Sequence, residues 1–378
     1  MKRSYHLVLA LLFVGASSLS STLQSQGLTL PQVSNSAELK QTVGISTIQI
    51  NYARPNVISP QGQDRTGNIW GSVVPYGFNN LGFGTATAAP WRAGANQNTI
   101  IEISHDVQVE GKSLPAGTYG FHVAVFEDGK ATAIFSKKHT AWGSYFYDEK
   151  DDALRVDVQT VEVPQTNLLT YHFTEAGNND AVLALDWEKK RIPVKFSFDT
   201  PELVYQNIKN ELETNPGFVL NSWTQAANYL VTNNIHLDDA LTWANAAVEG
   251  QFFSQKNYQT LSTKANVLNA MGKQSEAIAI MDEALEHPSA TINNYYAFGR
   301  QLIGQEQHDK ALTVFKKASK KWPNNWLAPH GLARGYSAAG DYSKALKYEK
   351  EAYAKAPAGS KQFIEGYLKS LEDGKDFN

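Results

Sequence analysis

The sequence repeats one short pattern three times, as Gly272-Lys-Gln-Ser-Glu-Ala277, Glu306-Gln-His-Asp-Lys-Ala311 and Gly340-Asp-Tyr-Ser-Lys-Ala345. The alanines that end these stretches are 34 residues apart. A second alanine follows each of them after seven residues, at Ala284, Ala318 and Ala352. Pro323 and Pro357 follow the last two units, and proline cannot continue a helix. This period predicts a stack of helix pairs in the C-terminal half of the chain.

The period of 34 residues and the order Ala…Ala…Pro resemble the tetratricopeptide repeat. The resemblance covers about residues 217–371, with repeats near 258–291, 292–325 and 326–357, a degenerate repeat before them and a capping helix after them. It implies an α-helical solenoid in which the first helix of each unit lines a concave face. It also implies a protein or peptide partner.

Polar and aromatic side chains recur on the predicted first helices. Asn266, Arg300 and Arg334 are spaced by the repeat length. The complete set of candidate partner-binding residues is Asn266, Asn269, Tyr296, Arg300, His330 and Arg334. Two arginines beside asparagine and tyrosine could clamp a carboxylate or an extended acidic peptide. The alternative is a solvated polar face that binds no ligand.

The N-terminal half has a different periodicity. From about Val43 to Phe198, hydrophobic residues alternate with polar ones, which predicts eight or nine short strands. Hairpin-length turns between them indicate an antiparallel β-sandwich or open barrel. Pro193 lies in the last strand and favours an edge position for it. The expected fold class is therefore α+β in two separate domains, at residues 27–199 and 200–378.

The strand-rich half carries a group of distinctive motifs: Tyr52-Ala-Arg-Pro55, Gly71-Ser-Val-Val-Pro-Tyr-Gly77, Trp91-Arg-Ala-Gly-Ala-Asn96, Leu114-Pro-Ala-Gly-Thr-Tyr119, Trp142-Gly143 and Asp151-Asp-Ala-Leu-Arg155. Together they resemble a secreted bacterial family of unknown function, domain of unknown function number 2911, which is common in Bacteroidetes-type bacteria. The resemblance spans about residues 30–198. Residues 78–90 look like extra sequence between two of the motifs. The resemblance implies export but supplies no activity.

Residues 54–98 are rich in proline, glycine and aromatic residues, and have little periodicity. This composition is typical of an ordered functional loop. The candidate ligand-binding residues on and beside it are Tyr52, Arg54, Trp91, Arg92, Asn96 and His122. Tryptophan could stack on an apolar ligand face while arginine and asparagine donate hydrogen bonds. Alternatively, Arg54 and Arg92 hold the loop by hydrogen bonds to backbone carbonyls.

The start of the sequence has the pattern of a signal peptide. Lys2 and Arg3 precede an apolar run at Leu7–Ala16, and small polar residues follow. This run is too short to span a membrane. We therefore expect a signal peptide at 1–26, cleaved after one of residues 18–26, and an exported protein that is periplasmic or extracellular.

The composition argues against several kinds of site. The sequence has no cysteine, which excludes disulfides, thiolate nucleophiles and cysteine-ligated zinc. With 34 basic and 37 acidic residues, its net charge of -3 argues against a nucleic-acid partner. It contains no phosphate loop, nucleophile elbow or paired histidine motif, so we predict no catalytic residue, no metal site and no cofactor.

Two further features have ordinary interpretations. His122 and His172 lie on the polar faces of predicted strands, where we expect them to be exposed. An acidic run lacks the spacing of a calcium loop and is expected to be a solvated turn; it consists of Asp148, Glu149, Asp151 and Asp152.

These patterns favour a non-enzymatic binding or scaffold protein without a membrane span. The β-domain would bind an unknown small molecule, glycan or envelope partner, and the helical repeats would bind a protein or peptide. The alternative is a hydrolase or carbohydrate-active enzyme with its site under the 54–98 loop. That alternative requires Arg92 and Asn96 to meet an ionisable group of shifted pKa in a deep pocket. A purely structural envelope component is a third possibility.

Overall fold

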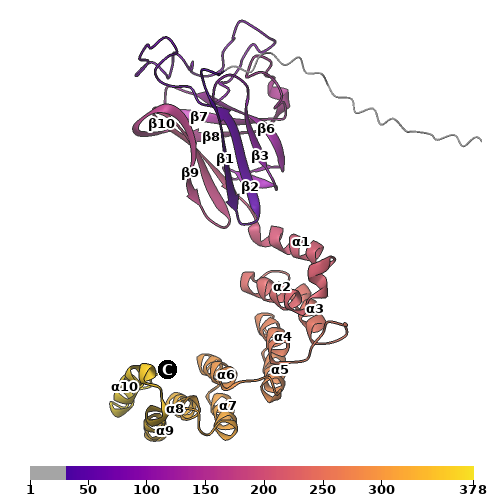
Figure 1. Cartoon of the computed structure of the whole chain (residues 1–378), viewed down its shortest axis with the longest axis vertical. Coiled ribbons are helices and arrows are strands. Elements are labelled where there is room, and N and C mark those ends of the chain that lie inside the picture. The colour runs from indigo at the N-terminus through magenta and orange to yellow at the C-terminus, as the bar shows by residue number, and fades with distance from the viewer. Residues whose placement is uncertain (1–30) are drawn as a thin grey trace, which may run out of the picture. The chain divides into compact units, whose positions relative to one another are not determined.

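The computed structural model describes residues 31–378 (Figure 1). The chain divides into two compact units at the junction of Phe198 and Asp199. The expected signal peptide at 1–26 lies outside the described residues. Among residues 31–378, no helix combines the length and the apolar character needed to cross a membrane.

The N-terminal unit contains two sheets in which every strand pair is antiparallel. The first sheet has the order β1-β2-β3-β6-β7-β8, from β1 (Ser36–Val43), β2 (Ser46–Ala53), β3 (Thr99–Ile103), β6 (Gly117–Val125), β7 (Lys130–Ser136) and β8 (Asp152–Gln159). The second has the order β5-β4-β10-β9, from β4 (Val107–Val109), β5 (Lys112–Leu114), β9 (Val161–Ala176) and β10 (Asp180–Ser197). A short 3-10 helix at Glu149–Asp151 precedes β8.

Aromatic rings from both sheets meet in the core of this unit. Tyr52 of β2 contacts Tyr171 of β9 with ring centroids 4.6 Å apart. Phe135 of β7 and Phe196 of β10 are 6.1 Å apart. Because alternate side chains of a strand point to the same face, the period of two in the sequence corresponds to one buried face per sheet. The expectation of an antiparallel sandwich is confirmed, and the sheets do not close into a barrel.

The expectation that Pro193 marks an edge strand was wrong, because β10 lies between β4 and β9. The ladder with β9 extends to Arg191, and the paired residues of the β4 ladder begin at Phe196. Pro193 falls between the two ladders. Neither ladder needs the N–H that proline lacks, so an internal strand tolerates it there.

The 54–98 loop packs on the sandwich through tryptophan. The Trp91 ring stacks on the ring of Trp187, a buried residue of β10, at 6.0 Å, and Trp70 packs edge-on against both. Trp91 also exchanges two backbone hydrogen bonds of 2.8 and 3.0 Å with Val123 of β6. These contacts hold an irregular segment in one place over the end of the sandwich.

The described part of the C-terminal unit is helical: α1 (Thr200–Leu212), α2 (Leu220–Asn233), α3 (Leu237–Val248), α4 (Tyr258–Ala270), α5 (Gln274–Glu286), α6 (Ile292–Gly304), α7 (His308–Lys321), α8 (Leu327–Ala338), α9 (Tyr342–Lys355) and α10 (Ala358–Glu372). A 3-10 turn at Asn215–Phe218 links α1 to α2. The helices follow one another in chain order (Figure 1). The alanines of the repeat are all buried: Ala277, Ala284, Ala311, Ala318, Ala345 and Ala352. The expected helical solenoid is therefore confirmed.

Candidate functional site

A cavity of about 710 Å³ is lined mainly by residues of the 54–98 loop. Three of its lining residues are sequence-predicted ligand residues, namely Trp91, Arg92 and Asn96. Trp187 and several loop prolines contribute apolar wall, and Ser144 reaches the cavity from a different loop. A space of this size with apolar walls and few polar groups is typical of a small-molecule site.

The polar ends of the three lining residues are bound to backbone. Arg92 Nη1 donates to the carbonyl oxygen of Asn96, and its guanidinium carbon lies 5.0 Å from the centre of the Tyr145 ring. The Asn96 amide donates to the carbonyl of Ser34 over 2.9 Å. Trp91 Nε1 donates to the carbonyl of Gly94 over 3.1 Å. These bonds pin the loop and engage one polar donor of each of the three residues.

Two other predicted ligand residues lie away from the cavity lining. Arg54 donates to the carbonyl of Leu169 over 2.9 Å and to the hydroxyl of Thr170 over 2.6 Å. The Tyr52 hydroxyl accepts from the backbone N–H of Tyr171 over 3.1 Å. Both residues tie β2 and the start of the loop to β9. Their geometry matches the alternative in which the motif arginines bind backbone.

His122 is buried, so the expectation of an exposed histidine was wrong. Ser144 and Tyr147 cover this face of β6, and only 2% of His122 is exposed. The imidazole Nδ1 lies 3.0 Å from the Ser144 hydroxyl. Burial, with a smaller contribution from the charge of Arg92, lowers the pKa of His122 to about 4. The imidazole is therefore neutral at pH 7, directly behind a serine that lines the cavity.

His172 has a different environment and does not join His122. Its Nε2 lies 3.0 Å from a carboxylate oxygen of Asp186. Arg191 donates two hydrogen bonds of 2.8 Å to the same carboxylate. These bonds offset the effect of burial and lower the pKa of Asp186. This is a salt-bridged group on the second sheet.

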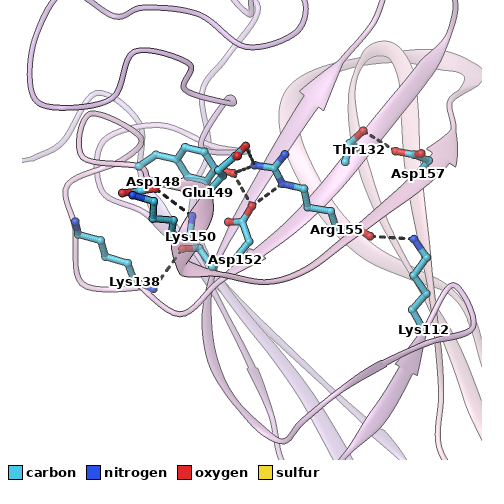
Figure 2. A network of polar contacts seen from close by, with 11 residues as sticks. Lys112, Thr132, Lys138, Asp148, Glu149, Lys150, Asp152, Arg155 and Asp157 are labelled. Carbon is cyan, nitrogen blue, oxygen red and sulfur yellow. Dashed lines mark hydrogen bonds and ion pairs between the residues drawn. The ribbon is translucent and has the colours of Figure 1, made fainter.

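A polar network joins Tyr147, Asp152 and Arg155, with Glu149 at its edge (Figure 2). One oxygen of Asp152 accepts from the Tyr147 hydroxyl over 2.6 Å and from Arg155 Nε over 2.5 Å. The other oxygen is buried and has no hydrogen-bond partner among the described residues. Burial raises the pKa of Asp152 despite these bonds. The expectation that the acidic run is a solvated turn was therefore wrong for Asp152. This residue begins β8 and is bound to Tyr147 and Arg155.

The candidate residues on the helices separate into two groups. Asn266, Asn269 and Arg300 are exposed. Tyr296, His330 and Arg334 meet one another and Tyr367 of α10, and we call these four residues the aromatic pocket.

Hydrogen bonds and a cation–π contact connect the residues of the aromatic pocket to one another and to Glu349. Arg334 Nε donates to the Tyr296 hydroxyl over 2.7 Å, and its guanidinium carbon lies 5.3 Å from the Tyr367 ring centre. His330 Nδ1 lies 2.8 and 2.9 Å from the two oxygens of the Glu349 carboxylate. Both His330 and Glu349 are buried. Arg300 lies beside the same Tyr296 ring at 6.0 Å, but its guanidinium is not buried as that of Arg334 is.

The pocket contains a segment of the chain itself, residues 376–378. The Phe377 ring lies 4.9 Å from Tyr367, and the guanidinium carbon of Arg334 lies 5.1 Å from its centre. The Asn378 side chain accepts from Arg334 Nη1 over 3.2 Å and donates to the Arg334 carbonyl over 3.1 Å. Asp376 accepts from the Ser337 hydroxyl over 2.6 Å. The helical unit thus holds three successive residues, and Asp376 also accepts from the Asn378 backbone N–H over 3.3 Å.

Residues 34–196 match the DUF2911 family model. That model is described as "Protein of unknown function (DUF2911)", and we refer to its match as the DUF2911 segment. A search of curated proteins finds no match.

Solved structures similar to this chain include one whose description names a TPR protein. "YrrB: a TPR protein with an unusual peptide-binding site" is 18% identical, covers 45% of this chain and 84% of its own, and has a TM-score of 0.32. MamA is 17% identical, with coverages of 41% and 88% and the same TM-score of 0.32.

The sequence interpretation missed several residues of these sites. Ser144 and Asp152 of the DUF2911 segment lie beside or in two motifs that mark the resemblance, and Asp152 was otherwise expected only in a solvated turn. Tyr147 lies between these two motifs. Phe377 and Glu349 carry no motif or repeat signal. In the described part of the chain, no three His, Asp or Glu side chains are grouped so that they could hold a metal ion.

Proposed function

We propose that this is an exported binding protein whose helical repeats hold an extended protein or peptide segment. The observation that carries the proposal is the aromatic pocket, where Arg334 and Tyr367 already contact another piece of chain, residues 376–378. A repeat array with such a pocket resembles a peptide-binding scaffold rather than an enzyme. Export is supported by the charged and apolar pattern of residues 2–16.

The pocket has the physical properties of a binding anchor. Aromatic rings bury a large area with little side-chain entropy to lose, and arginine adds cation–π attraction and hydrogen bonds. The buried Glu349 carboxylate holds the His330 ring of the pocket in one position. A partner therefore meets a surface that is already ordered, which lowers the entropic cost of binding.

Panning a random octapeptide phage library tests this function. The bait is the full chain with Gly-Ser-Gly in place of residues 376–378, which empties the pocket. We expect enriched peptides that lose binding when Tyr367→Ala is added, and retain it when Phe363→Ala is added. Phe363 is on the same helix but is 68% exposed outside the pocket. Circular dichroism checks that both variants are folded. No enrichment, or equal effects of the two substitutions, would refute peptide binding at this pocket.

The DUF2911 segment has a second candidate function, which is binding a small molecule or glycan. The cavity of about 710 Å³ with Trp91 in its wall favours this role. A glycan array and ligand-observed NMR with a soluble fragment set can test it. Ala95→Trp places a large ring at the cavity wall and should abolish binding. Ligands that bind the variant unchanged would contradict a role for this cavity.

The hydrolase alternative depends on Ser144 and His122. Their hydrogen bond and the position of Ser144 at the cavity resemble part of a nucleophile–base pair. A base with a pKa near 4 accepts a proton weakly at pH 7, so this geometry favours binding over acyl transfer. A fluorophosphonate probe decides between them. Labelling that Ser144→Ala abolishes would support the hydrolase, and no labelling would count against it.

A further inference from the structure

The 376–378 segment contacts the helical unit through groups that any peptide of similar sequence could supply. Its acidic residue meets the Ser337 hydroxyl, its ring meets Tyr367 and Arg334, and its carboxamide meets Arg334. Phe377 also donates its backbone N–H to the Ser337 hydroxyl over 3.3 Å. The helical unit therefore contacts three successive residues of the segment.

Each of the three positions has its own chemical requirement. Burial opposes ionisation of Asp376, but hydrogen bonds from Ser337 and Asn378 hold the pKa of its carboxyl below the usual value. The Asn378 side chain both accepts from and donates to Arg334, which a carboxylate could not do. The Phe377 ring packs against Tyr367 and lies 6.1 Å from the His330 ring.

The charge of the pocket selects against basic segments. Arg334 is the cation at its centre, and its guanidinium lies within 6 Å of the centres of Tyr296, Tyr367 and Phe377. The carboxylate of Glu349 is already paired with His330 beneath the rings. A lysine or arginine of a partner would therefore approach an existing cation, while an acidic or aromatic group is attracted.

We propose that this pocket recognises partner segments with the order acidic–aromatic–carboxamide, and that residues 376–378 occupy it as an internal competitor. This inference rests on the proposed peptide-binding function. A tethered competitor lowers the apparent affinity for a partner in proportion to the fraction of pockets it fills. A partner must then match or exceed the contacts of the internal segment.

The test uses a fluorescein-labelled octapeptide with the sequence of residues 371–378 and fluorescence anisotropy. We expect at least roughly tenfold tighter binding to the chain with Gly-Ser-Gly at 376–378 than to the unaltered chain. Replacing the aspartate of the peptide that corresponds to Asp376 by lysine, or its phenylalanine by alanine, should each weaken binding by at least about tenfold. A scrambled octapeptide that binds equally well would overturn the proposed specificity.

Two controls separate the parts of the proposal. Phe377→Ala opens the pocket with one substitution, so a binding gain there repeats the result without replacing the whole segment. Equal affinity of the peptide for the unaltered and open chains would overturn the competitor role. A concentration-dependent dimer of the unaltered chain that Phe377→Ala removes would overturn internal occupancy, because the segment would then bind a second copy.

The outcomes also distinguish this inference from the function on which it rests. If the phage library yields Tyr367-dependent peptides of a different order, peptide binding stands and the acidic–aromatic–carboxamide preference fails. If neither the library nor the octapeptide binds the open chain, both fail.

Discussion

At the scale of single residues, His122 combines burial with one weak polar contact. Its imidazole is packed against Tyr147, and its Nδ1 meets the hydroxyl of Ser144. Burial, together with the positive charge of Arg92, makes protonation unfavourable and lowers the pKa to about 4. Since the unfolded chain exposes the same imidazole to water, folding and protonation are linked at this site.

The expected consequence is loss of stability in mild acid. With an unfolded pKa of 6.5 and a folded pKa of about 4, the unfolded state binds more protons between these values. The stabilisation is complete above pH 6.5 and is lost as pH falls towards 4, by about 3 kcal/mol in all. Urea unfolding at pH 7.5 and at pH 4.5 measures this loss as a difference in unfolding free energy. His122→Gln should remove most of this difference, and His105→Gln in the same unit should not.

The hydroxyl of Tyr147 supports the second residue-level prediction. It donates to Asp152 over 2.6 Å and accepts from Arg155 over 2.5 Å. Tyr147→Phe removes both bonds and leaves partly buried charges less satisfied, so we expect a loss of about 1–2 kcal/mol of unfolding free energy. Tyr145→Phe is the control, because its hydroxyl has no hydrogen-bond partner among residues 31–378. Equal losses in urea unfolding would contradict a special role for the Tyr147 hydroxyl.

At the scale of elements, three helices approach closely around one ring. Phe315 of α7 is buried, and a side-chain carbon at Gly299 of α6 would lie 2.3 Å from its ring. A carbon at Gly331 of α8 would lie 2.5 Å from it. The glycines therefore permit the contact of α6 and α8 with α7, on which the position of Tyr296 and Arg334 depends.

Gly299→Ala should therefore destabilise the helical unit. Overpacking a tight contact costs about 1–3 kcal/mol, more than the gain in helix propensity. Gly304→Ala is the matched control in α6, because its added carbon meets nothing within 4 Å. We expect Gly304→Ala to be neutral or stabilising by up to about 1 kcal/mol. Thermal unfolding followed by circular dichroism compares them, and a neutral Gly299→Ala would show that the helices can shift apart.

At the scale of the whole molecule, export is the main prediction. In a bacterial host, the protein should be recovered outside the cytoplasm with a new N-terminus at one of residues 19–27, as determined by mass spectrometry. Leu11→Arg with Leu12→Arg interrupts the apolar run and should retain the full-length chain in the cytoplasm. The pair Leu11→Val and Leu12→Val keeps the run apolar and should be exported. Export of the arginine variant would rule out this signal peptide.

Local patterns in the sequence were sufficient to predict both fold classes. A period of two and a period of 34 residues report which faces of strands and helices are buried, and this information repeats along the chain. The alternation of hydrophobic and polar residues is a local feature, so it can be recognised without knowing which distant residues meet. The antiparallel sandwich and the helical solenoid could therefore be predicted before any contact between distant residues was known.

Only the tertiary structure decided which residues share a site. Arg54 lies 115 residues from the carbonyl that it binds, and Arg334 lies 44 residues from Asn378. The periodicity of the sequence does not predict such contacts, because they form only when separate elements pack together. For the same reason, the strand pattern placed His122 on a polar face, and only the covering loop made that face buried. The candidate ligand and partner residues themselves stay predictions. The tertiary structure shows that three of them, Tyr296, His330 and Arg334, meet one another, and that His330 and Arg334 also contact residues 376–378.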